Sequence, residues 1–191
     1  MARSSSGRRL GRSFFDRPTV RVARELLGAT VVARGPDGPR SVRLVEVEAY
    51  LRGDPASHAF RGLTRRNRSM FGPPGTLYVY RIHQVVCANL VTRRGEAVLL
   101  RAGAPGSERE GNPSGPGRLC RSLGITIEDD GSSVTGPGRI AVRSRSGPVG
   151  RVVRTPRVGI SQATERRLRF SVARDRWVSR PRPAVPSASP S

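Results

Sequence analysis

The stretch VEVEAY at residues 45–50 alternates apolar and polar side chains, which predicts a β-strand. Side chains two residues apart point to the same face of a strand, so the apolar residues from Val45 onward are expected on one face and Glu46 and Glu48 on the other. The two carboxylates would lie about 7 Å apart, and like charges that close raise at least one pKa where water is scarce. This arrangement suits acid–base chemistry, but the spacing alone favours an edge strand with a solvated polar face.

The flanking sequence predicts many strands and few helices. Strands are expected at residues 29–33, 42–50, 77–82, 85–92, 97–102, 139–143, 158–161 and 169–173. Helices are expected at residues 16–28 and 119–123, each ending at a glycine. Short turns join these elements, and the sequence contains no internal repeat. We therefore expect one α+β domain built on a curved, largely antiparallel β-sheet with flanking helices.

The two ends differ in composition from the middle of the chain. Residues 1–13 are rich in Ser, Gly and Arg without periodicity, which predicts a disordered basic arm. Residues 180–191 are rich in Pro and Ser, which predicts a disordered tail. Residues 14–179 remain as the folded domain.

The chain is strongly basic, with 35 Lys+Arg residues, all of them arginine, against 14 acidic residues and a net charge of +21. Codon bias explains arginine in place of lysine but not the excess of base over acid. The excess predicts a polyanionic partner, with nucleic acid favoured over an acidic membrane. No apolar run approaches the ~18 residues of a membrane span, and the N-terminus lacks the apolar core of a signal peptide. We expect a monomer in the bacterial cytoplasm, associated with the nucleoid.

Cysteine and histidine are scarce. Cys87, Cys120, His58 and His83 are the only such residues, and their spacing matches no metal-binding motif. We therefore expect buried thiols, no metal and no cofactor.

Several motifs follow one another in a fixed order. They are EVEAY at 46–50, DPASHA at 54–59, TRRN at 64–67, MFGPPGTLYVY at 70–80, VLLRA at 98–102, GPGRLC at 115–120, PRVGI at 156–160, RF at 169–170 and WVS at 177–179. The series covers about residues 14–179 and resembles the alkyladenine (3-methyladenine) DNA glycosylase family, the monofunctional base-excision repair enzymes. The resemblance implies an α+β fold, double-stranded DNA containing damaged purines as the partner, and no cofactor.

The resemblance also implies a catalytic apparatus. Glu48 matches the glutamate that activates the attacking water, and Arg101 matches an arginine that helps to position that water. The expected substrates are alkylated or deaminated purines such as 3-methyladenine, ethenoadenine and hypoxanthine, and the expected product is an abasic site. A lyase reaction needs an amine, usually a lysine, and this chain has none. Glu46 suits a structural role or the holding of nearby arginines better than catalysis.

The damaged base must be flipped out of the stack and held by aromatic faces. Tyr50, His58 and Tyr80 match the family's base-stacking residues. Asn89 matches the residue that excludes the 2-amino group of guanine, and Tyr78 is interpreted as a core residue.

The chain departs from the family pattern at one place. His83 stands where the family has a tyrosine that wedges into the duplex, and the span from Tyr80 to Asn89 is one residue shorter than usual. Because a one-residue slip turns strand side chains to the opposite face, the shortening must fall in the turn around Gln84 if Asn89 is to keep its role.

Residues 61–68 are rich in arginine. A solvated loop is the simplest interpretation, but in so basic a chain we expect DNA backbone contacts from Thr64, Arg65, Arg66 and Asn67.

Two other functions remain open from the residues alone. Glu46 and Glu48 could act as the carboxylate pair of an O-glycoside hydrolase, although such pairs normally come from different elements. A non-catalytic nucleic-acid-binding module would explain the charge but not the retained site motifs.

Overall fold

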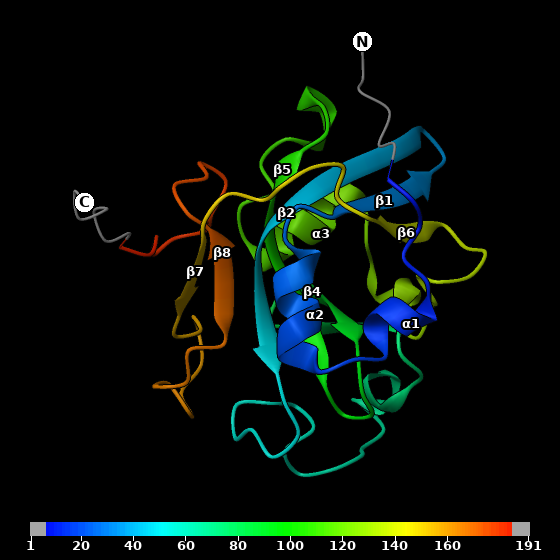
Figure 1. Ribbon diagram of the computed structural model, residues 1–191. Helices are drawn as coiled ribbons and strands as arrows, with labels where there is room; N and C mark the ends of the chain where they lie inside the picture. The colour runs from blue at the N-terminus through cyan, green and yellow to red at the C-terminus, as the bar shows by residue number, and fades with distance from the viewer. Residues whose placement is uncertain (1–6, 185–191) are drawn as a thin grey trace.

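One curled antiparallel sheet forms the centre of the protein, and the computed structural model describes residues 7–184 (Figure 1). The eight strands are β1 Thr30–Gly35, β2 Gly38–Tyr50, β3 Leu77–Ile82, β4 Val85–Val91, β5 Ala97–Pro105, β6 Ile140–Arg143, β7 Val152–Thr155 and β8 Arg169–Val172. The helices are α1 Arg12–Phe15, α2 Thr19–Leu26 and α3 Pro116–Leu123, with short 3-10 helices η1 Arg68–Phe71, η2 Glu108–Glu110 and η3 Ile127–Asp129. This single-domain α+β architecture confirms the predicted fold class.

Strand β2 lies at the middle of the sheet. It pairs with β5 along one edge, and along the other edge first with β1 and then with β8. Residues 45–50 therefore do not form a solvated edge strand, and both Glu46 and Glu48 are fully buried. Strands β3 and β4 continue the sheet beyond β5, while β7 pairs only with β8 among the described strands.

The two faces of the sheet carry different side chains. One face packs the main hydrophobic core against α2 and α3, with Val47, Val79 and Leu100 among its buried residues. The alternate residues of β2, β3 and β5 point to the opposite face, as the period of two requires. That opposite face carries Glu48 and Tyr80 and forms the candidate site.

A pair of adjacent irregularities interrupts the pairing of β2 with β5. The register steps from Leu44↔Gly103 to Glu46↔Ala102 and then to Val47↔Leu100, which leaves Val45 and Arg101 as extra residues. A bulge re-aims nearby side chains. Alternation predicted that Val45 shares a face with Val47, and this prediction is wrong. Val45 packs in a separate small cluster with Ala102 and Val178.

Residues 7–13 do not behave as a disordered arm. Leu10 is buried and its N–H bonds to the carbonyl of Val142, while Arg9 forms a β-bridge with Arg143. Residues 1–6, like residues 185–191 of the expected tail, lie outside the described part of the chain. Within the expected tail, the carbonyl of Pro181 accepts a hydrogen bond from buried Arg169.

Two further elements differ from expectation. Helix α2 begins at Thr19 after Pro18, so Asp16 ends α1 rather than capping α2. Residues 158–161 form a loop instead of a strand, whereas β7 was not predicted. No helix within residues 7–184 is long and apolar enough to cross a membrane.

Candidate active site

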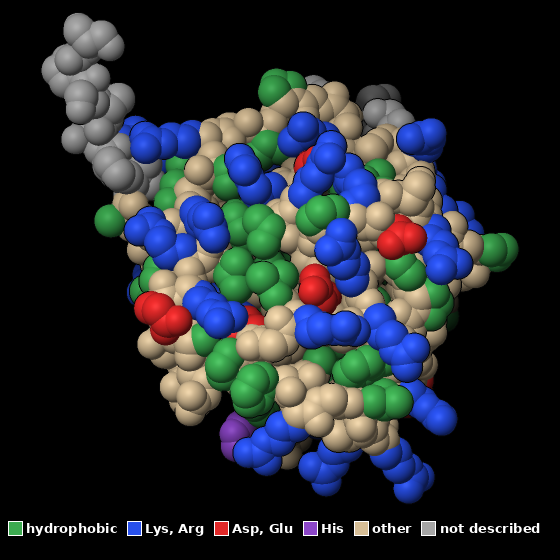
Figure 2. Space-filling model, turned by 60° about the horizontal axis from the view of Figure 1, so that its bottom comes forward, with side chains coloured by type: hydrophobic (Ala, Val, Ile, Leu, Met, Phe, Trp, Pro, Cys, Tyr) green, Lys and Arg blue, Asp and Glu red, His purple; other side chains and the backbone are tan. Residues whose placement is uncertain are grey.

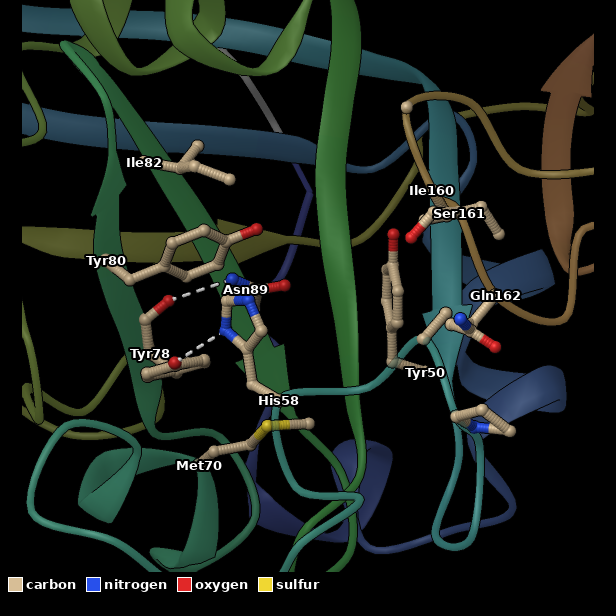
Figure 3. Close-up of a pocket in the computed structure, with 13 residues that line it drawn as sticks. Tyr50, His58, Met70, Tyr78, Tyr80, Ile82, Asn89, Ile160, Ser161 and Gln162 are labelled. Atoms are coloured by element: carbon tan, nitrogen blue, oxygen red, sulfur yellow. Dashed lines mark hydrogen bonds between the residues drawn. The ribbon is translucent and has the colours of Figure 1, made fainter.

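A cavity of about 250 Å³ opens on the polar face of the sheet, between the ends of β2, β3 and β4 and the loops at 51–60 and 156–162. It brings together four of the residues predicted from the sequence: Tyr50, His58, Tyr80 and Asn89. Figure 3 shows Tyr50 on one side of the cavity and the other three on the opposite side. A flat ring could enter between these two walls.

One wall is an aromatic cluster built on β3. His58 Nδ1 lies 2.9 Å from the Tyr78 hydroxyl, and the His58 and Tyr80 rings are 4.4 Å apart between centroids (Figure 3). Packing against the tyrosines removes water from one side of His58 and lowers its pKa, so the ring is neutral near pH 7. Tyr78 lines the cavity and holds His58, a role that the sequence interpretation missed.

Asn89 lies across from Tyr78 in the β3–β4 pairing and is 4% exposed. Its amide Nδ2 donates to the Tyr78 carbonyl at 3.2 Å, which fixes the side chain at the cavity wall. The hairpin closes with only two residues, because Ile82 pairs directly with Val85. The shortened span therefore lies in the turn, and the strand register keeps Asn89 facing the cavity.

Glu48 is the candidate base beside the cavity. Its carboxylate accepts hydrogen bonds from the Tyr50 hydroxyl at 3.0 Å and from the Val158 N–H at 2.9 Å. Arg101 Nε lies 3.5 Å from the same carboxylate. Burial raises the pKa of Glu48, and Arg101, Val158 and Tyr50 only partly oppose that effect.

Glu46, two residues earlier, is bound far more completely. It accepts hydrogen bonds from Arg169 Nε at 2.7 Å, from the Ser179 N–H at 2.6 Å and from the Ser179 hydroxyl at 2.9 Å. Arg101 Nε is a further ion-pair partner at 2.9 Å. Glu46 therefore joins β2 to the C-terminal segment and holds Arg101 next to Glu48, which disfavours the two carboxylates acting as a hydrolytic pair.

Segment 156–162 forms part of the cavity wall and was missed as a functional element. Val158 supplies an N–H to Glu48, and Gly159, with φ +76°, turns the chain toward the cavity. The sequence analysis noted the PRVGI motif and predicted a strand there. The glycine of the motif was the signal that could have indicated a turn instead.

His83 lies outside the cavity, at the exposed tip of the β3–β4 hairpin. Its φ of +50° is in the left-handed region, which histidine adopts more readily than most residues. Its neighbours Ile82 and Val85 expose 51% and 42% of their surface. Two exposed apolar side chains therefore flank the turn that carries the imidazole.

The arginine-rich loop contains two kinds of residue. Thr64, Arg65 and Arg66 are exposed. Asn67 is only 3% exposed: its side chain accepts the Thr64 N–H at 2.6 Å and donates to the His58 carbonyl at 2.8 Å. These contacts support a role for Asn67 in shaping the loop rather than in touching DNA. Arginine side chains spread over the face shown in Figure 2, among few acidic ones.

Metal-binding clusters are not found in the part of the chain that the structure describes. No group of three or more His, Cys, Asp or Glu side chains within residues 7–184 is placed to hold an ion. Cys87 and Cys120 are buried free thiols, as predicted.

Comparisons with known proteins identify one family. The family model described as methylpurine-DNA glycosylase (MPG) matches residues 13–176. A relative from Methanoculleus marisnigri is 45% identical, covering 88% of this chain and 97% of its own length. Relatives from Frankia casuarinae and Rhizobium etli are 43% and 40% identical, covering 91% and 89% of this chain and 93% and 88% of their own lengths. All three are provisionally named 3-methyladenine DNA glycosylases.

Proposed function

The chain belongs to the methylpurine-DNA glycosylase family, and we propose that it removes alkylated or deaminated purines from double-stranded DNA by hydrolysing their N-glycosidic bond. The observation that carries the proposal is a fully buried Glu48 with spare acceptor capacity, next to an aromatic cavity and to Arg101. The substrates we propose are 3-methyladenine, ethenoadenine and hypoxanthine.

Glu48 acts on water in the proposed reaction. A carboxylate has about four acceptor positions, and the bonds from Tyr50 and Val158 occupy two of those on Glu48. The remaining capacity allows the group to accept a proton from water as that water attacks the anomeric carbon and the N-glycosidic bond breaks. A cationic base such as 3-methyladenine leaves as a neutral molecule, whereas a neutral base such as hypoxanthine must also take up a proton or be stabilised by hydrogen bonds as it leaves. Its negative charge also stabilises the positive charge that develops on the sugar. Arg101 positions the water and opposes the effect of burial on the pKa of the carboxyl group.

The aromatic walls hold the flipped base. Tyr50 on one side and either His58 or Tyr80 on the other can stack on a flat purine. The His58 and Tyr80 rings are inclined at 67° to one another, so only one of them can lie parallel to the base. Electron-poor damaged bases stack better against electron-rich rings, which favours damaged over normal purines. The Asn89 side chain, held by the Tyr78 carbonyl, occupies the space that the 2-amino group of guanine would need and so excludes guanine sterically.

The direct experiment incubates the protein with duplexes that carry one 3-methyladenine, ethenoadenine or hypoxanthine and measures released base and abasic sites. We expect free base, an intact abasic strand and no borohydride-trapped complex, because the chain lacks lysine for a Schiff base. Binding without base release would instead support a non-catalytic DNA-binding module.

We propose His83 as the wedge that fills the gap left by the flipped nucleotide, since it stands at the exposed hairpin tip. Replacing His83 by Ala is expected to lower excision from duplex DNA by about tenfold or more, but to leave single-strand excision nearly unchanged because no gap needs filling there. Gln84→Ala in the same turn is the matched control. Equal duplex excision by His83→Ala and the parent protein would refute the wedge.

We propose that Arg65 and Arg66 contact DNA phosphates, with Thr64 beside them, because all three side chains are exposed on one loop. In Arg65→Ala/Arg66→Ala, the log–log slope of binding against salt concentration should become shallower by about 0.9 for each phosphate that is no longer neutralised. The exposed pair Arg93→Ala/Arg94→Ala tests whether any two surface arginines give the same change. An unchanged slope in the first double variant would remove this loop from the DNA interface.

A further inference from the structure

Asp54 and Arg157 form a buried ion pair behind the cavity wall, with no part in the reaction proposed above. Asp54 is fully buried and Arg157 is 5% exposed. Both amino groups of Arg157 donate to the Asp54 carboxylate, Nη2 at 2.9 Å from Oδ1. Such a bidentate pair fixes orientation as well as distance. It ties the loop at 51–60 to the segment at 156–162, the two segments that flank the cavity.

Asp54 organises the loop that carries His58. Its Oδ1 accepts the Ala56 N–H at 3.1 Å, and its carbonyl accepts the Ser57 N–H at 2.8 Å. Burial alone would raise the pKa of Asp54, but the bonds from Arg157 and Ala56 outweigh it and lower the pKa. The carboxylate is therefore ionised at neutral pH.

Arg157 contacts the end of β2 and the base-stacking tyrosine. Its Nη1 donates to the carbonyl of Ala49 at 3.1 Å, and its guanidinium carbon lies 4.6 Å from the centre of the Tyr50 ring. The next residue, Val158, gives its N–H to Glu48. The Arg157 side chain thus supports the Tyr50 ring directly, and its backbone leads straight into Val158, the residue whose N–H donates to Glu48.

We propose that Arg157, held by Asp54, is a positioning residue for base excision: it fixes Tyr50 for stacking and sets the Val158 N–H on Glu48. This inference rests on the proposed function.

The pair also balances charge beside the cavity. Arg157 stacks on Tyr50, which lines the cavity, and Asp54 neutralises its charge. A cationic base such as 3-methyladenine therefore meets a neutral pair rather than a lone guanidinium. Without Asp54, the uncompensated charge would oppose cationic bases and leave neutral ones little affected.

The first test is Arg157→Lys, which keeps the charge but loses the bidentate fork and the planar stack. Loss of the Val158 hydrogen bond would raise the pKa of Glu48, while Arg101, Tyr50 and Glu46 around it stay unchanged. We expect single-turnover excision of ethenoadenine to fall by about tenfold, and the acidic limb of its pH profile to move to higher pH.

Arg166→Lys is the matched control. Arg166 Nη1 lies 3.9 Å from the same Asp54 carboxylate, but its side chain is 41% exposed and, within residues 7–184, it neither stacks on Tyr50 nor donates to Glu48. The single-turnover excision rate of Arg166→Lys should stay within about twofold of that of the parent protein, and the pH profile of this variant should not move. An unmoved pH profile in folded Arg157→Lys overturns the positioning role.

The second test is Asp54→Asn, which leaves Arg157 in place with its charge unmatched. The ratio of 3-methyladenine to ethenoadenine excision should fall by about fivefold or more. Equal losses on both substrates overturn the charge argument but agree with the positioning role. If Arg157→Lys does not fold, an Asp54→Asn variant with parental rates and an unmoved pH profile overturns the positioning role. A parent protein that releases no base contradicts the proposed function itself, whereas an active parent with unaffected variants contradicts only the role of the pair.

Discussion

Glu46 and Glu48 stand two residues apart on β2 and are equally buried, yet the carboxylate of Glu46 is hydrogen-bonded more completely than that of Glu48. Glu46 receives three hydrogen bonds from Arg169 and Ser179, in addition to the Arg101 ion pair at 2.9 Å. Glu48 receives two hydrogen bonds, and Arg101 lies farther away at 3.5 Å.

The difference arises from what covers each residue. The C-terminal segment folds back over Glu46 and brings Ser179 onto it, so that with Arg169 three of the roughly four acceptor positions of the carboxylate are filled by hydrogen bonds. Glu48 receives the Val158 N–H from the neighbouring loop and the hydroxyl of Tyr50. A buried carboxylate supports the fold when its lone pairs are filled, and it can act on water when some are left free.

The largest effect should come from Glu48→Gln. The amide keeps the shape of the side chain but cannot accept a proton, so excision should fall by about 10²- to 10⁴-fold. Affinity for lesion DNA should stay within about tenfold, because the cavity remains. Single-turnover base release and equilibrium binding on the same duplex measure the two quantities. Parental turnover would remove Glu48 from the mechanism.

The converse change, Glu46→Gln, should act on stability. It leaves two buried arginines, Arg101 and Arg169, without their shared countercharge, which is expected to cost about 3–5 kcal/mol in the free energy of unfolding. Denaturant unfolding measures this loss. Excision corrected for the folded fraction should fall far less than in Glu48→Gln, and the reverse order would contradict the division of roles.

The sequence indicated where the strands lie because the period of two is a local property. Leu77–Ile82 was predicted with its exact bounds, and the resemblance selected Tyr50, His58, Tyr80 and Asn89, which the fold does bring together. Their roles in catalysis and binding stay predictions.

The features that sequence patterns missed depend on distant partners. The bulges at Val45 and Arg101 exist only in the pairing of β2 with β5, and no local pattern reveals them. Residues 158–161 have β-branched character, but Gly159 turns the chain. Asn67 sits in a loop whose composition indicates exposure, and only the fold shows that this one side chain turns inward.

The smallest effect sharpens the comparison most, and it concerns the stability of Glu48→Gln. Burial raises the pKa of Glu48 in the folded state above its ordinary value of 4.5. The folded protein therefore binds this proton more tightly than the unfolded chain, and the resulting stabilisation is present below about pH 4.5 and lost as pH rises through the folded pKa. Glutamine undergoes no such loss.

The free energy of unfolding of Glu48→Gln, relative to the parent, should therefore increase between about pH 4.5 and neutrality, by about 1.4 kcal/mol for each tenfold difference in proton affinity between the folded and unfolded states. Glu25→Gln is a control of opposite sign. Arg21 and Arg17 outweigh burial and lower the pKa of Glu25, so this substitution should reduce the free energy of unfolding at neutral pH by about 0.2–1 kcal/mol. Unfolding curves collected across this pH range test both signs. A relative stability of Glu48→Gln that decreases with pH would mean that Glu48, like Glu46, serves the fold.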